Sequence, residues 1–282
     1  MIEVVSVSLG AAERDRTATL HLGGERVRIR RIGCSGDYGL AARLLAQFDG
    51  TVGAIGLGGL NFTYRVRGRT WPMPGADPLR RAVRITPLVD GCGFKDRVEP
   101  QAASVLPGGG QALVVSVLDR PAAAAALVAA GYRVRAGDAH FALGLPIWPT
   151  EATFNALAAV AMPVLRHLPR DVVYGAREAA DAGGHALWEV IWGDVQLLRR
   201  HPVPLGGATV VAGSLREEDA RWLRKCGVRS VIGASPPVEG EVFGANVWEA
   251  ALTAISGRAL GPDEIESVWA AAYERTDWVT IV

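Results

Sequence analysis

The feature that most constrains the fold is a regular alternation of short apolar segments and helical segments after residue 110. The apolar segments are residues 112–118, 132–136, 187–192, 208–212 and 230–233. The stretches between them are too long for hairpins and carry apolar residues at helical spacing. The same pattern predicts a helix near residues 177–182 and a last strand at residues 278–282. We therefore predict an α/β fold, with a Rossmann-like, doubly wound, mostly parallel sheet in residues 109–282.

The first 108 residues have a different pattern, which predicts a smaller N-terminal mixed α/β domain. Residues 17–22 and 26–32 flank a Gly-Gly-Glu sequence that is typical of a β-hairpin. Residues 37–48 then carry apolar side chains at helical spacing. Three successive glycines at residues 108–110 mark the expected linker. We place the domain boundary there, with residues 1–108 on one side and residues 109–282 on the other.

Composition and charge exclude several classes of protein. The chain has 30 basic and 29 acidic residues, so it lacks the basic excess of a nucleic-acid or membrane-surface binder. The first ten residues do not read as a signal peptide, and the longest apolar stretch, residues 156–165, falls far short of the roughly 20 residues of a membrane span. The three cysteines form no C-x-x-C pair. We expect a cytoplasmic protein with a small-molecule substrate, no nucleic-acid or membrane partner and no metal, and we leave a homo-oligomer open.

Aspartates follow three of the expected strands. Asp90 comes directly after Val89, and Asp138 and Asp194 each follow a strand and a glycine. Ligands of doubly wound sheets bind at the carboxyl ends of strands, where such a carboxylate can accept a ribose or sugar hydroxyl. The alternative is helix capping, for which aspartate is a favoured residue. A carboxylate-bound metal would require all three aspartates to converge.

Lys95 is conspicuous because only two of the 30 basic residues are lysines. Lysine can lose its proton near neutral pH, whereas arginine cannot act as an acid or base there. Lys95 lies between Asp90 and Asp96 on a glycine-rich turn, where the three could exchange a proton with a substrate hydroxyl. The alternative is an ordinary surface lysine. The second lysine, Lys225, fits the end of an amphipathic helix and is assigned a structural role.

A glycine run follows the strand at residues 52–57. It contains Gly56, Gly58, Gly59 and then Asn61, but it does not match G-x-G-x-x-G and no helix is predicted after it. A dinucleotide fingerprint places its pyrophosphate at a helix N-terminus, so a tight turn is the alternative to ligand contact.

Polar residues near the later strand ends are candidates for substrate binding. His140 lies two residues after Asp138, and Arg199 and Arg200 precede His201 close to Asp194. The two arginines could hold an anionic substrate or form an ordinary polar helix end. Asn246 and Glu249 have the spacing of a helix-capping pair.

Five segments that span most of the chain match a known family. They are residues 54–59, residues 86–91 with Phe94 and Lys95, residues 137–146, residues 193–194 with Arg199 and Arg200, and residues 243–250. On these segments the sequence resembles the bacterial family labelled quinate 5-dehydrogenase. The resemblance implies NAD(P)-dependent oxidation of a polyhydroxylated cyclohexane acid.

The working hypothesis is therefore an oxidoreductase that uses NAD or NADP and acts on a small quinate- or shikimate-like acid. Lys95 would be the acid or base, tuned by Asp90 or Asp96. The expected cofactor-binding residues are Gly56, Gly58, Gly59, Asp138 and Asp194, and the expected substrate-binding residues are Asn61, His140, Arg199, Arg200 and Asn246. Because the dinucleotide fingerprint is missing, we keep one alternative, a non-redox Rossmann-like protein that binds a small anionic or nucleotide-like ligand.

Overall fold

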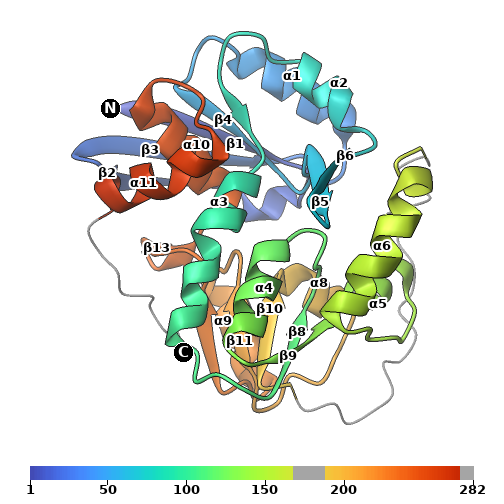
Figure 1. The fold of residues 1–282 in the computed structure, drawn as a ribbon. Coiled ribbons are helices and arrows are strands. Elements are labelled where there is room, and N and C mark those ends of the chain that lie inside the picture. The colour runs from blue at the N-terminus through green and yellow to red at the C-terminus, as the bar shows by residue number, and fades with distance from the viewer. Residues whose placement is uncertain (168–187, 274–282) are drawn as a thin grey trace. The chain divides into compact units, whose positions relative to one another are not determined.

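The computed structural model describes residues 1–167 and 188–273 (Figure 1). The chain divides into two compact units, each assembled from separate stretches of sequence. Unit 1 contains residues 1–62, 75–98 and 243–277, and unit 2 contains residues 63–74, 99–242 and 278–282. The expected helix near residues 177–182 and the expected strand at residues 278–282 lie outside the described residues.

Unit 1 is built on a mixed five-stranded sheet with the order β2-β3-β1-β4-β7. Strands β3, β1, β4 and β7 are parallel to their neighbours, and β2 forms an antiparallel hairpin with β3. The strands are β1 (Ile2–Ser8), β2 (Arg16–Leu22), β3 (Glu25–Gly33), β4 (Ala54–Gly58) and β7 (Leu88–Val89). In the central strand β1, Val4, Val5 and Val7 are all fully buried, as expected for a strand covered on both faces.

The helices of unit 1 include two that come from the C-terminal part of the chain. They are α1 (Tyr38–Phe48), α2 (Ala76–Arg81), α3 (Cys92–Arg97), α10 (Ala245–Ser256) and α11 (Pro262–Ala272). Helix α10 lies along β1 and β4 (Figure 1). The rings of Phe94, Trp248 and Trp269 join α3, α10 and α11, with centroids 5.3 to 6.2 Å apart. This aromatic cluster holds α3 against α10 and α11.

Unit 2 contains a five-stranded sheet in which every strand is parallel to its neighbours, with the order β12-β11-β10-β8-β9. The strands are β8 (Gln111–Val114), β9 (Arg133–Ala136), β10 (Val190–Gly193), β11 (Thr209–Ala212) and β12 (Ser230–Gly233). Two hairpins complete its strands: β5 (Thr63–Val66) with β6 (Arg69–Pro72), and β13 (Pro237–Val238) with β14 (Glu241–Val242).

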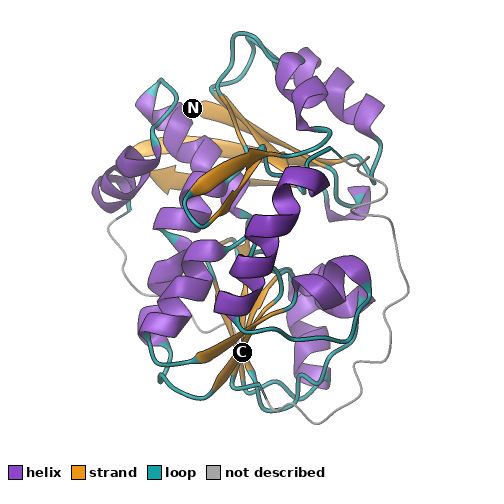
Figure 2. Ribbon diagram, turned by 45° about the vertical axis from the view of Figure 1, so that its right-hand side comes forward, coloured by secondary structure: helices purple, strands orange, loops and turns teal. Residues whose placement is uncertain are grey.

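Helices lie on both faces of the parallel sheet (Figure 2). The described α-helices are α4 (Pro121–Ala129), α5 (Asp138–Leu143), α6 (Glu151–Leu165), α8 (Val195–Arg200) and α9 (Glu217–Lys225), and short 3-10 turns lie at Glu99–Val105 here and at Ala12–Arg14 in unit 1. Successive residues of each strand enter two different apolar cores: Val190 and Trp192 pack with α4, and Ile191 packs with α8 and α9. Period-two alternation between two buried faces explains why these strands read as continuous apolar runs.

The α/β fold and the parallel sheet predicted for the C-terminal region are confirmed. The division into units differs from a single boundary after residue 108, because α10 and α11 join unit 1 and the β5–β6 hairpin joins unit 2. Helix α10 buries nine of its twelve residues. The spacing of apolar residues indicates that such a helix is buried on several sides. It does not indicate which sheet the helix packs against.

Within residues 1–167 and 188–273, none of the helices is both long enough and apolar enough to cross a membrane.

The contact between β4 and α10 depends on Gly56. A Cβ atom at this residue would overlap the backbone carbonyl of Asn246. We expect Gly56→Ala to lower the free energy of unfolding by about 1–3 kcal/mol, as overpacking of a core does. Gly39→Ala in α1 is the matched control, since its Cβ would meet only the side chains of Asp37 and Arg43. Chemical denaturation followed by tryptophan fluorescence measures both, and equal stability of the two variants would contradict this packing role.

Candidate functional site

Buried polar side chains gather in unit 1 where β4 and β7 end. After β4 the chain turns at Gly59, which has a φ of +78°, and after β7 it turns at Gly91, which has a φ of +86°. These left-handed conformations favour glycine, because a Cβ would clash with the backbone. The two turns bring Asn61 and Asp90 to the same edge of the sheet. The ends of two parallel strands thus present an amide and a carboxylate side by side.

Lys95 is held at this edge. Its Nζ donates a hydrogen bond of 2.8 Å to Oδ1 of Asn61. Lys95 is 9% exposed and Asn61 is 5% exposed. Lysine is rarely buried without polar partners, so a lysine this deeply placed is not an ordinary surface residue. The structure therefore brings together two residues that the sequence had singled out for different reasons.

Asp90 connects the two loops. Its Oδ2 accepts a hydrogen bond of 2.6 Å from the backbone N–H of Phe62, and its Oδ1 accepts one of 3.0 Å from Cys92 N–H. The first bond fixes the segment after β4, and the second fixes the start of α3, the short helix that carries Lys95. Asp96 is half-buried on the same short helix. Asp90 thus positions both the segment that contains Asn61 and the helix that contains Lys95.

Glu249 of α10 completes the cluster, and sequence reasoning assigned it only to capping. Its Oε2 accepts a hydrogen bond of 2.9 Å from Phe94 N–H, across 155 positions of sequence. Burial raises the pKa of Glu249 to about 7; the bond from Phe94 opposes this, the Asp90 charge adds to it and the Lys95 charge lowers it. The only sequence signal for Glu249 was a carboxylate within an otherwise apolar helix.

Asn246 ties the start of α10 to the sheet. Its Nδ2 donates a hydrogen bond of 2.8 Å to Ser6 Oγ in β1. Both Gly56 and Gly58 lie against Asn246, so these glycines allow the start of α10 to approach β4 closely. Gly59 forms the turn after β4. No helix follows β4 before the β5 hairpin, and a helix N-terminus for a pyrophosphate is therefore missing from this part of the chain.

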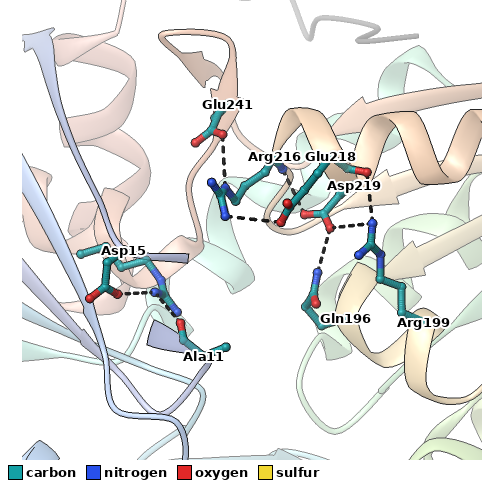
Figure 3. Close-up of polar contacts among 9 residues, drawn as sticks. Ala11, Asp15, Gln196, Arg199, Arg216, Glu218, Asp219 and Glu241 are labelled. Carbon is teal, nitrogen blue, oxygen red and sulfur yellow. Dashed lines mark hydrogen bonds and ion pairs between the residues drawn. The ribbon is translucent and has the colours of Figure 1, made fainter. Parts of the chain in front are cut away.

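A second polar group of unit 1 lies at the ends of β1 and β3, and no motif in the sequence indicates it. Arg31 donates from Nη2 to Ser8 Oγ at 3.1 Å. Its Nη1 donates to Asp15 Oδ1 at 3.0 Å and to the Ala11 carbonyl at 3.1 Å, and Figure 3 draws these two bonds beside the labelled Asp15 and Ala11. These bonds fix the loop after β1. Only the register of the parallel strands, which sequence does not give, places Arg31 there.

In unit 2, Asp138 holds a loop. Its carboxylate accepts hydrogen bonds from Ser116 Oγ at 2.7 Å, Val117 N–H at 2.8 Å and Leu118 N–H at 3.2 Å. Burial raises the pKa of Asp138 to about 6, although these hydrogen bonds act in the opposite direction. With three donors already on its two oxygens, this side chain fixes the loop after β8.

Asp194 and Arg199 also have local partners. Asp194 is the N-cap of α8 and accepts a hydrogen bond of 2.7 Å from Gln196 N–H. Arg199 pairs at 3.5 Å with Asp219, which is 0% exposed and also accepts a hydrogen bond of 2.9 Å from Gln196 Nε2 (Figure 3). Arg200 is exposed at the end of the helix. Asp194 therefore caps a helix, and Arg199 and Arg200 form a polar helix end, as the alternatives to ligand binding predicted.

The structure therefore separates the expected site residues into two groups. Unit 1 contains those around the Lys95 cluster, namely Lys95, Asp90, Asp96, Gly56, Gly58, Gly59, Asn61 and Asn246. Unit 2 contains Asp138, His140, Asp194, Arg199 and Arg200. Asp90 does not share a unit with Asp138 and Asp194.

Comparison with known proteins identifies the family. A family model described as a domain of unknown function (DUF8754) matches residues 101–275, more than half of the chain. The chain belongs to the DUF8754 family. A second model with the same kind of description (DUF8753) matches residues 3–90 of this DUF8754 protein. None of the curated proteins matches it.

A solved structure similar to the DUF8754 chain is that of an ABC transporter solute-binding protein from Burkholderia multivorans, crystallised with an unknown ligand. The two are 15% identical, the match covers 95% of this chain and 92% of the other, and the TM-score is 0.36.

The expectation of an NAD(P)-dependent, quinate-dehydrogenase-like oxidoreductase is corrected. In the DUF8754 chain itself, Gly56 and Gly58 pack against Asn246. Asp138 and Asp194 are engaged by backbone N–H groups of unit 2. The sequence of the glycine run at residues 56–59 is compatible with a cofactor turn. It does not reveal that α10 packs against Gly56 and Gly58.

The raised pKa of Glu249 predicts a pH-dependent stability of the DUF8754 protein. In this pH range the folded state binds more protons than the unfolded state, so stability falls as pH rises from about 4.5 to about 7. Glu249→Gln keeps an acceptor for Phe94 N–H and removes this dependence, which we expect to amount to about 3 kcal/mol across the window. Urea unfolding at several pH values measures it. Exposed Glu266→Gln in α11 is the control, and parallel pH profiles for the wild type and Glu249→Gln would refute the assignment.

The pairing of Arg199 with buried Asp219 predicts a structural role. We expect Arg199→Met to lower the free energy of unfolding by about 1–2 kcal/mol, because a buried carboxylate loses a charged partner. Arg200→Met removes an equal charge from the same helix end and should change stability by less than about 0.5 kcal/mol. Thermal or urea unfolding compares the two, and equal effects would favour a role for Arg199 other than holding Asp219.

Proposed function

We propose that this protein is a non-redox binder of a small, uncharged, hydroxyl-rich ligand, held in unit 1 at the carboxyl ends of β4 and β7. The observation that carries the proposal is the buried Lys95–Asn61 pair beside Asp90, at the edge of a parallel sheet where ligands of such folds bind. A lysine, an amide and a carboxylate offer both donors and acceptors within one cluster, which suits hydroxyl groups.

The strand orders support a Rossmann-like, doubly wound description of both units. In unit 2 the order β9-β8-β10-β11-β12 is that of flavodoxin-like sheets. In unit 1 the parallel strands have the order β3-β1-β4-β7, so the chain passes from one side of β1 to the other. The ends of β1 and β4 form the topological switch point of this sheet. The Lys95 cluster borders that point through Asn61, which follows β4.

The charges within the cluster favour an uncharged ligand over an anion. Lys95 contributes one positive charge, and Asp90 contributes one negative charge. Glu249, whose pKa is about 7, adds a further partial negative charge near neutral pH. A phosphate or carboxylate would meet no net positive charge in this cluster. A sugar or polyol would exchange hydroxyl hydrogen bonds with water for equivalent bonds with these side chains.

Ligand screening by thermal unfolding tests the proposal. The panel contains neutral sugars and polyols, their phosphate esters, and NADH and NADPH. We expect at least one neutral compound to raise the melting temperature, since a ligand at 100 times its dissociation constant stabilises by about 2.7 kcal/mol. Stabilisation by phosphate esters or nicotinamide nucleotides alone would overturn the choice of ligand.

The chain offers a matched pair of variants for this screen. Lys95→Met should weaken binding of the compound found by tenfold or more, about 1.4 kcal/mol. Lys225→Met removes the other lysine, which is exposed at the end of α9, and should leave the affinity unchanged. Isothermal titration calorimetry measures both. If the two variants bound equally well, the site would not be at Lys95.

A further inference from the structure

His140 of unit 2 is buried in an unusual way. It is 0% exposed, and neither of its ring nitrogens has a hydrogen-bond partner within the described part of the chain. The large majority of buried side-chain polar atoms in proteins are paired, and each exception requires an explanation. An unpaired buried donor or acceptor costs about 1–3 kcal/mol, and a neutral imidazole has one of each. Something that binds imidazole nitrogen would offset this cost.

A second imidazole lies beside the first. His201, at the end of α8, has its ring centroid 6.2 Å from that of His140, and its buried Nδ1 also lacks a partner among the described residues. Both backbones are fixed, since His140 N–H donates to the Gly137 carbonyl and His201 N–H donates to the Leu197 carbonyl, each at 2.9 Å. Two rings with three unpaired nitrogens thus meet in one place on rigid helix ends.

The surroundings of the two rings are aromatic. Trp148 lies 4.7 Å and Phe141 lies 5.0 Å from His140, measured between ring centroids, and Phe141 lies 6.1 Å from His201. Burial lowers the pKa of both histidines, with a smaller contribution from His201 for His140 and from Arg200 for His201. The neutral imidazole is the form of histidine that binds metal ions.

We propose that His140 and His201 form a two-coordinate site for a monovalent d10 metal ion, Cu(I). The separation of the rings supports this coordination. Two imidazoles on a tetrahedral zinc, with Zn–N distances of ~2.0–2.1 Å, have centroids about 5 Å apart, whereas a linear pair at similar bond lengths reaches about 6 Å. The observed 6.2 Å matches the linear arrangement.

The number of available ligands and the cost of burying charge also favour Cu(I). Within residues 1–167 and 188–273, no cluster of three or more histidine, cysteine, aspartate or glutamate side chains is arranged to hold a metal. Zn(II) and Cu(II) require more ligands than two imidazoles, and a divalent ion buried without a carboxylate is costly. A single positive charge costs less to bury and is attracted by the faces of Trp148 and Phe141.

The test uses a background without thiols, because Cys34, Cys92 and Cys226 form no disulfide and thiols bind Cu(I) themselves. In the Cys34→Ala, Cys92→Ala, Cys226→Ala protein, Cu(I) is titrated anaerobically in competition with a chromophoric Cu(I) chelator, and Ag(I) serves as a redox-inert probe. We expect one ion per chain. X-ray absorption of the copper-loaded protein should report nitrogen neighbours and no sulfur.

Variants assign the site. His140→Phe and His201→Phe should each weaken binding by more than the roughly 10–100-fold that loss of an outer-shell partner costs. His21→Phe, at an exposed histidine of β2, is the matched control and should bind as the background does. The metal-free His140→Phe protein should melt at the same temperature as the background or higher, because two unpaired nitrogens are removed. This readout separates loss of a ligand from loss of the fold.

Three results would overturn the proposal. The chelator could retain all of the Cu(I), the two phenylalanine variants could bind as tightly as His21→Phe, or Zn(II) could bind more tightly than Cu(I). The first two results would leave His140 as an unpaired core residue, and the third would replace the linear coordination by a tetrahedral one.

Discussion

The close approach of α10 to the sheet of unit 1 determines most of what surrounds it. At Gly56 and Gly91 a Cβ would overlap the backbone of Asn246 or its neighbour Ala245, and at Gly93 it would overlap the side chain of Ile265 in α11. Because these residues are glycines, α10 can lie directly on the strand ends and α11 can lie directly on α3. Because α10 reaches this depth, Glu249 meets Phe94 N–H at 2.9 Å. The Lys95 cluster is therefore a consequence of backbone packing.

That packing also accounts for the electrostatics of the cluster. Helix α10 is buried over most of its surface, so Glu249 loses water and its pKa rises. The hydrogen bond from Phe94 compensates only in part, and the charge of Lys95 opposes that of Asp90 at the same carboxyl group. The cluster is thus close to neutral without being apolar. Such a region is better suited to exchanging hydrogen bonds with a ligand than to attracting an ion.

Sequence reasoning located much of this cluster, because several of its signals are local. Asp90 and Asn61 follow strands, and Lys95 was visible against a background of arginine. Glu249 was missed because its partner is 155 positions away, and its spacing from Asn246 already had a local explanation. The placement of α10 and α11 in unit 1 was missed for a related reason. Periodicity describes which face of a helix is apolar, whereas the choice of sheet depends on contacts between distant parts of the chain.

Two buried carboxylates show why burial does not by itself indicate a binding site. Asp138 and Glu249 are both deeply buried, and burial raises the pKa of each. Asp138 accepts three hydrogen bonds from the loop after β8, so its oxygens are used in holding that loop. Glu249 has a lysine and a second carboxylate within electrostatic reach, and their charges act on its pKa in opposite directions. A ligand whose hydroxyl group donates a hydrogen bond to this cluster would change the electrostatic environment of Glu249. The titratable neighbours therefore distinguish a candidate site from a structural support, and burial alone does not.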